Sequence, residues 1–216
     1  MKYLDDIDGY CTLQEKDASI ELLNAKNDEN TDENIFKICD ILGIKKPSNI
    51  LEAKAFIFKA REKSVSNIID VMITCDCGEI NMVQVDISTL FYKDKEKLDN
   101  SIPIKIVQDF DEISKIYPDI LDLSLEECTE IENRFKHNNK IIFDSIIKSN
   151  CRKCNSLLVT DIDYKNIISK FNIKNIYEQY LDLTQHTNMT KKDVDDMPPF
   201  EREIFLNLIQ EKIDKA

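Results

Sequence analysis

The chain has 216 residues, of which 42% are hydrophobic and 32% charged, a balance typical of a folded globular protein rather than a disordered one. The formal net charge is −12 and the lysines form only short groups, so we expect no nucleic-acid partner. Three widely spaced glycines exclude the glycine-rich phosphate loops of dinucleotide- and nucleotide-binding proteins, and no apolar run is long enough to span a membrane.

The first part of the chain is predicted to be helical. Apolar residues recur at helical spacing over three stretches: 13–26, 31–42 and 47–64. A polar turn at 28–32 separates the first two stretches, and Gly43 is expected to end the second.

The pattern then changes to that of strands. Residues 65–74 are β-branched and apolar, and apolar residues in 80–87 alternate roughly by two, which predicts two strands of a hairpin. The turn of this hairpin would carry the sequence Cys-Asp-Cys-Gly at 75–78. A third strand is expected over 102–107, and Pro103 would place it at a sheet edge or a strand start.

Helical spacing returns in the second half, over 124–137, 140–148, 164–171 and 173–183. A short apolar, strand-like run at 157–162 interrupts it. The polar stretch 187–199 contains two adjacent prolines and is predicted to be a linker. It precedes a predicted amphipathic helix over 200–213, which either packs on the domain or forms a detachable partner-binding arm. We therefore expect an α+β fold, mostly helical with a small antiparallel β-sheet, as a domain over 1–186 followed by a linker and helix over 187–216.

Four of the seven cysteines form two close pairs, Cys75 with Cys77 and Cys151 with Cys154, separated by a long intervening segment. Zinc binds four soft ligands in a tetrahedron, and two hairpin tips that each donate two thiolates are a common solution. Gly78 and Asn155 follow the two pairs, and these residue types tolerate the left-handed backbone that such turns require. The pattern predicts a zinc-ribbon-like site of four cysteines with structural zinc, because four thiolates leave no open position for water.

Two other interpretations of these cysteines compete with a zinc site. They could be incidental, or the Cys-x-x-Cys pair could be a redox motif, but that motif normally opens a helix and here an apolar strand-like run follows. Cys39 is expected to be a small core residue, and His137 and His186 to be exposed to solvent. No arrangement of nucleophile, histidine and acid can be defended, so we expect no catalytic residues, no small-molecule substrate and no enzyme.

Two segments of the chain resemble a known family. Residues 56–66 (Phe-Ile-Phe-Lys-Ala-Arg-Glu-Lys-Ser-Val-Ser) lead into a strand and then into Thr-Cys-Asp-Cys-Gly at 74–78. This run resembles the baseplate hub assembly proteins of T4-like contractile-tailed bacteriophages. The segment Met-Pro-Pro-Phe-Glu-Arg-Glu-Ile-Phe at 197–205 is similar to a short helix near the C-terminus of many members. The chain departs from the family in two places: Ser66 replaces the usual glycine, and the two cysteines of the first pair are closer in sequence than in the family.

The resemblance implies a role in virion morphogenesis. Such a protein would be a tail baseplate hub assembly factor, acting as a chaperone, or a minor hub structural subunit, and its partners would be other phage tail and hub proteins. Its location would be the host cytoplasm during assembly, with the virion tail baseplate as a second location. The alternative, from another class, is a zinc-ribbon adaptor that binds host or viral transcription machinery.

Overall fold

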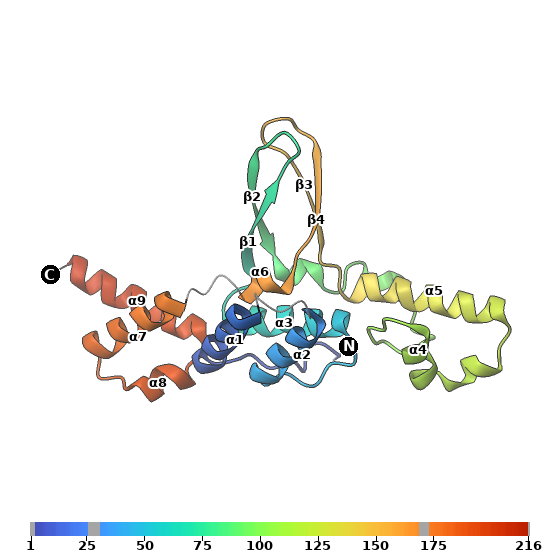
Figure 1. Ribbon diagram of the computed structural model, residues 1–216, viewed down its shortest axis with the longest axis horizontal. Helices are drawn as coiled ribbons and strands as arrows, with labels where there is room; N and C mark the ends of the chain where they lie inside the picture. The colour runs from blue at the N-terminus through green and yellow to red at the C-terminus, as the bar shows by residue number, and fades with distance from the viewer. Residues whose placement is uncertain (1–2, 26–30, 169–172, 216) are drawn as a thin grey trace. The chain divides into compact units, whose positions relative to one another are not determined.

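The computed structural model describes residues 3–25, 31–168 and 173–215, and Figure 1 shows its elements. The helices and strands in chain order are α1 (Thr12–Ala25), α2 (Thr31–Ile41), α3 (Ile50–Ser64), β1 (Ile68–Thr74), β2 (Ile80–Asp86), η1 (Ile87–Leu90), η2 (Lys95–Lys97), α4 (Phe110–Ile116), η3 (Pro118–Asp122), α5 (Leu125–Ile142), β3 (Ile146–Asn150), β4 (Leu157–Asp161), α6 (Tyr164–Ile168), α7 (Ile173–His186), α8 (Lys191–Asp196) and α9 (Pro199–Asp214). Helices dominate and the strands pair antiparallel, so the expected α+β class is confirmed.

The chain forms two compact units that interleave along the sequence. Unit 1 comprises Met1–Asp6, Pro47–Ala55 and Ile68–Asp163. Unit 2 comprises Ile7–Lys46, Phe56–Asn67 and Tyr164–Ala216, so the residues on both sides of position 186 belong to the same unit. Within the described residues, no helix combines the length and the apolar content needed to cross a lipid bilayer.

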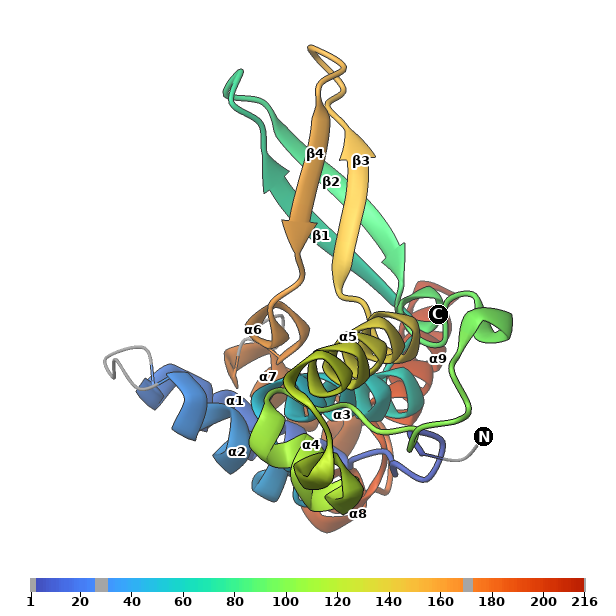
Figure 2. The same cartoon turned by 90° about the vertical axis from the view of Figure 1, so that its right-hand side faces the viewer.

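Unit 1 contains two antiparallel hairpins in place of the single small sheet expected. Strands β1 and β2 pair over their whole length, as do β3 and β4, and the two pairs form separate two-stranded sheets. The hairpins stand side by side in both views (Figures 1 and 2). Along β1 the side chains of Ile69, Val71 and Ile73 are buried while their neighbours are exposed, as in a strand with one face packed against the protein.

A short bridge joins the bases of the two hairpins. Phe91, just after β2, pairs with Phe143, just before β3, and their ring centroids lie 5.1 Å apart. Two backbone hydrogen bonds frame this bridge: Tyr92 N–H donates to Ile142 at 3.0 Å, and Asp144 N–H donates to Leu90 at 2.9 Å.

Two secondary-structure predictions in unit 1 are wrong. The helix expected over 140–148 ends with α5 at Ile142, because the backbone of Phe143 is extended for its bridge, and the following residues form β3. The strand expected over 102–107 is an extended segment without a partner strand. The side chain of Asn139 bonds both backbone groups of Val107, at 3.1 and 2.5 Å, and so takes the place of a neighbouring strand.

One apolar core cluster of unit 1 is built by the segment that precedes α4 and by the helices that follow it. Ile102, Ile113, Ile120 and Phe135 are among its buried members, and they come from the extended segment, α4, η3 and α5. Helix α5 begins at a capping box in which Ser124 and Glu127 bond each other's backbone N–H groups.

Unit 2 is helical, and the predicted linker contains a helix. Within 187–199 the structure shows α8, which begins at a capping box formed by Thr190 and Asp193 and buries Val194 completely. Val194 belongs to a core cluster with Ile176, Tyr180 and Leu183 of α7. The polar turn expected at 28–32 lies mostly outside the described residues.

A buried ion pair ties the two ends of unit 2 together. Arg202 of α9 donates from Nη2 to Glu15 Oε2 of α1 at 2.9 Å, and the two side chains are 4% and 1% exposed. The N–H and the hydroxyl of Thr12 both donate to the carbonyl of Met197, at 2.8 and 2.9 Å. The start of the C-terminal helix is therefore packed within unit 2, as the first of the two alternatives for this helix expected.

Candidate metal centre

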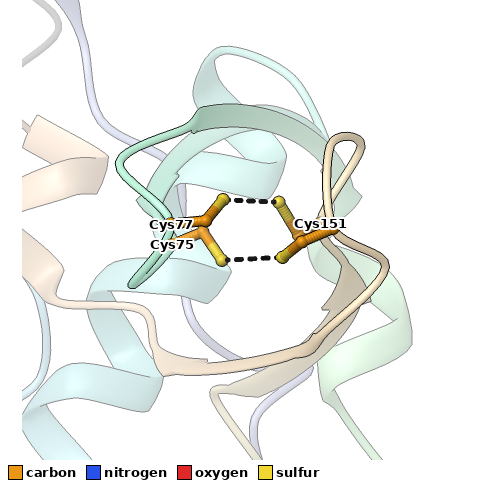
Figure 3. A group of neighbouring side chains, drawn as sticks. Cys75, Cys77 and Cys151 are labelled. Atoms are coloured by element: carbon orange, nitrogen blue, oxygen red, sulfur yellow. Dashed lines mark hydrogen bonds between the residues drawn. The ribbon is translucent and has the colours of Figure 1, made fainter.

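The four predicted cysteine ligands lie in the two hairpin turns of unit 1. Cys75 and Cys77 follow the end of β1, and Cys151 and Cys154 lie between β3 and β4. Figure 3 shows the sulfur atoms of Cys75 and Cys77 pointing across to the sulfurs of the other turn, where Cys151 is labelled. The structure therefore brings together all four residues that the sequence analysis selected.

The sulfur positions fit tetrahedral coordination. All four Sγ atoms lie within 4.8 Å of one another. The Sγ–Sγ distance is 3.5 Å between Cys75 and Cys154 and 3.7 Å between Cys77 and Cys151. Ligands at about 2.3 Å from a central zinc ion would be separated by about 3.8 Å at the corners of a regular tetrahedron. These four cysteines can therefore hold a metal ion.

Both turns use the left-handed backbone that the sequence predicted. Gly78 has φ 82° and Asn155 has φ 60°. The Gly78 N–H donates to the carbonyl of Cys75 at 2.8 Å, and the Asn155 N–H donates to that of Cys151 at 2.9 Å. These bonds close the turns tightly enough that each pair of sulfurs lies on the same side, facing the opposite hairpin.

The surroundings of Cys151 and Cys154 favour the thiolate form of both side chains. The backbone N–H of Cys154 has the largest effect on Cys151 and lowers the pKa of this thiol to about 6, with further help from the Lys153 N–H and against the opposing effect of burial. Contact with the Ser156 hydroxyl, 3.2 Å from the Cys154 sulfur, lowers the pKa of Cys154. Amide groups that point at sulfur are a common feature of metal-binding turns, because they stabilise the thiolate that binds the ion.

The opposite turn differs in this respect. The Cys77 N–H favours the thiolate of Cys75, but burial and the thiols of Cys154, Cys77 and Cys151 together raise the pKa of Cys75 to about 12. Four thiols this close cannot all ionise without a cation, because each negative charge disfavours the next. A bound divalent ion removes this conflict, because a thiol that coordinates the ion loses its proton.

Asn81 supports the site, and the sequence analysis did not select it. Its side chain is 1% exposed and donates from Nδ2 to Cys151 Sγ at 3.6 Å, while its Oδ1 accepts the backbone N–H of Arg152 at 2.8 Å. Asn81 lies on β2 and both of its partners lie in the opposite turn, so it links the two hairpins independently of any ion. Its only sequence signal is its position four residues after Cys77, within the strand that the first cysteine pair introduces.

The remaining candidates lie apart from the centre. Cys39 is a buried core residue, as expected, and burial raises the pKa of its thiol to about 12. His137 and His186 are exposed, also as expected. Within the centre, Cys75 and Cys151 are buried, whereas Cys77 and Cys154 are exposed on the surface of unit 1.

Comparisons of the chain with protein-family models, with curated proteins and with solved structures gave no match.

Proposed function

We propose that the four cysteines bind one structural zinc ion that fastens the two hairpins of unit 1, and that the chain is an assembly protein of the phage tail baseplate hub. The observation that carries the zinc proposal is the gathering of four sulfurs from two turns within 4.8 Å. Thiolates in a tetrahedron are the preferred ligands of zinc, and four protein ligands complete the coordination shell. Such an ion has no position for substrate or reactive water, so its role is to stabilise the fold.

The assembly role depends on the resemblance of residues 56–66, 74–78 and 197–205 to the hub assembly family. Several of these residues hold unit 2 together. Arg202 pairs with Glu15, and the Ser64 hydroxyl accepts the backbone N–H of Tyr10 at 2.5 Å and donates to the carbonyl of Ala60. The first and last of these segments therefore contribute to one folded unit, which supports treating them as parts of a single pattern. A structural ion and a net charge of −12 suit a protein that acts through protein–protein contacts.

Elemental analysis tests the zinc proposal. The full chain, purified under reducing conditions, should contain about one zinc ion per molecule, and the Cys75→Ser/Cys151→Ser variant should contain almost none. Cys128→Ser is the matched control, because Cys128 lies outside the centre and should leave the zinc content unchanged. Iron in place of zinc would refute the identity of the metal, and metal-free protein would refute the site.

Co-purification tests the assembly proposal. The tagged chain should be expressed together with the tail proteins encoded near it, and we expect a stable complex with at least one hub component. The same preparation should be examined for host RNA polymerase. Binding to polymerase without any tail protein would favour the transcription adaptor, and binding to neither would refute the assembly role.

A further inference from the structure

A groove runs between the two hairpins of unit 1 on the side of β2 and β3. Residues 83–86 of β2 and 146–148 of β3 form its walls, and its volume is about 670 Å³. We call it the β2–β3 groove. The bridge between Phe91 and Phe143 joins the two hairpins at their bases, and the contact of Arg152 Nη2 with the Met82 carbonyl, at 3.2 Å, joins them again near the cysteines.

The backbone of β2 directs part of its N–H and C=O groups away from β1, toward this groove. In an antiparallel pair, alternate residues direct their N–H and C=O groups to the partner strand and to the open edge. Cys75 N–H donates to the carbonyl of Glu79, so by register Val83 and Val85 bond to β1. Met82 and Gln84 must therefore point their backbone groups to the open edge, and the bond between Met82 and Arg152 agrees with this assignment.

The same reasoning applies to β3. Cys151 N–H donates to Ser156 and Ile162 N–H donates to Ser145, which pairs Ile147 with β4. Lys148 then directs its N–H and C=O to the open edge. Since β2 and β3 belong to separate sheets, no ladder joins them within the described residues. The groove thus has two strand edges able to accept an added strand.

The groove is lined by more lysines than aspartates, although the chain as a whole is acidic. Lys93, Lys140 and Lys148 line it together with Asp86 and Asp144. Both aspartates already have local partners: Asp86 accepts from the N–H and hydroxyl of Ser88, and Asp144 accepts from Lys93 at 3.4 Å and from the N–H of Ile146. In the described structure Lys140 and Lys148 are exposed and make no ion pair, so their charges are available to a partner.

We propose that the β2–β3 groove binds an extended acidic segment of a partner protein, which adds a strand to the open edge of β3 or β2. Main-chain hydrogen bonds would supply the affinity, and the lysines would select acidic side chains. A second copy of the same edge is disfavoured, because lysine would face lysine, and this is a common way in which proteins prevent edge-to-edge association. The proposal rests on the proposed function in one respect, because the metal holds the far end of the groove together.

A synthetic peptide of alternating Glu and Val residues, labelled with a fluorophore, tests this proposal on the full metal-loaded chain. We expect it to bind by fluorescence anisotropy, more tightly than the matching peptide of alternating Lys and Val. Lys140→Glu/Lys148→Glu should weaken the binding roughly tenfold or more and should instead improve binding of the lysine peptide. Lys115→Glu, an exposed lysine of α4 outside the groove, is the control for a single charge reversal and should leave the binding nearly unchanged.

A second peptide distinguishes strand addition from simple charge attraction. N-methylation of alternate residues removes the backbone donors along one edge of the peptide and should abolish binding if a ladder forms. No binding of the acidic peptide, equal binding by the double variant, or equal binding of the N-methylated peptide would each overturn the proposal. Peptide binding without any hub partner in co-purification would refute the assembly role and leave the groove standing.

Discussion

The two units solve the same structural problem with different chemistry. In unit 1, two turns far apart in the sequence meet through four thiols whose sulfurs lie within 4.8 Å. In unit 2, α1 and α9 meet through the buried pair of Glu15 and Arg202, whose charged atoms are 2.9 Å apart. The proposed metal centre would take its cation from solution, whereas the ion pair carries both charges within the chain. The stability of unit 1 should therefore depend on metal and redox conditions, and that of unit 2 on burial.

The largest loss of stability is expected when the proposed metal ion is removed. Addition of a strong chelator should open the hairpins of unit 1 and cost several kcal/mol, because metal binding is coupled to folding at such sites. Amide hydrogen exchange read by mass spectrometry should show faster exchange in β1–β4 and little change in α1 and α9. A uniform increase in exchange across both units would show that the cysteine cluster of unit 1 and the ion pair of unit 2 do not stabilise their units independently.

The second effect should be confined to unit 2. Arg202→Met leaves the Glu15 carboxylate buried without its main partner, and we expect a loss of about 3–5 kcal/mol in the free energy of unfolding. The zinc content should stay the same. Glu15→Met/Arg202→Met should be less destabilising than Arg202→Met alone, because the double variant leaves no Glu15 carboxylate buried without its partner. The nearby Arg61 keeps its own bond to the Ile167 carbonyl at 3.2 Å.

Urea unfolding of the wild type and both variants measures these differences. If the double variant is less stable than Arg202→Met, then the pair stabilises the fold beyond the cost of burying its charges. The stability of unit 2 would then depend on the attraction between the two charges and not on burial alone.

The cysteine cluster of unit 1 and the ion pair of unit 2 differ in how far the sequence predicts them. The cysteines can be found because two close pairs with Gly78 and Asn155 behind them form a pattern that few other structures require. Glu15 and Arg202 carry no such pattern: the sequence holds 41 acidic and 29 basic residues, and only packing shows which two meet. Most of the longer helices could likewise be predicted from the periodicity of their apolar residues, but the short helix α8 within the predicted linker could not.

The failures have local causes. Strand β3 follows directly from the end of α5, and the apolar residues Ile141, Ile142 and Ile146 continue a helical spacing into it. The change of structure depends on the bridge between Phe143 and Phe91, which is a long-range contact. Residues 102–107, predicted as a strand, do have extended backbone, but the side-chain amide of Asn139 bonds it in place of a partner strand. The periodicity of apolar residues is the same whether an extended segment pairs with a strand or with a side chain.

A smaller effect concerns the support of the metal centre. Asn81→Ala removes the donor to Cys151 and the acceptor for the Arg152 N–H, and should weaken metal affinity about 10–100-fold. Competition with a chromophoric chelator measures this change. Asn150→Ala is the control, because Asn150 is exposed at the end of β3 and should leave the affinity nearly unchanged. Equal affinities for the two variants would mean that the ion alone positions the two turns.

The smallest effect comes from an ion pair in unit 1 that is only partly buried, and it measures how much burial matters to the pair in unit 2. Arg134 donates from Nε to Asp99 at 2.6 Å, and the two side chains are 34% and 27% exposed. Arg134, with added hydrogen bonds from Ser101, holds the pKa of Asp99 well below its ordinary value of 3.8. Asp99→Asn should cost about 1 kcal/mol or less at neutral pH, because solvent screens such pairs.

The pH dependence of this difference follows from the lowered pKa. A carboxylate whose pKa is lower in the folded state contributes its full stabilisation above the ordinary value, and loses it as the pH falls through the folded-state value. The difference in unfolding free energy between wild type and Asp99→Asn should therefore be constant from pH 7 to about 5 and should shrink only in stronger acid. A difference that shrinks already near pH 6 would assign the effect to another group. If Asp99→Asn lowers the free energy of unfolding as much as Arg202→Met does, then burial does not make the ion pair of unit 2 more important to stability than the partly exposed pair of unit 1.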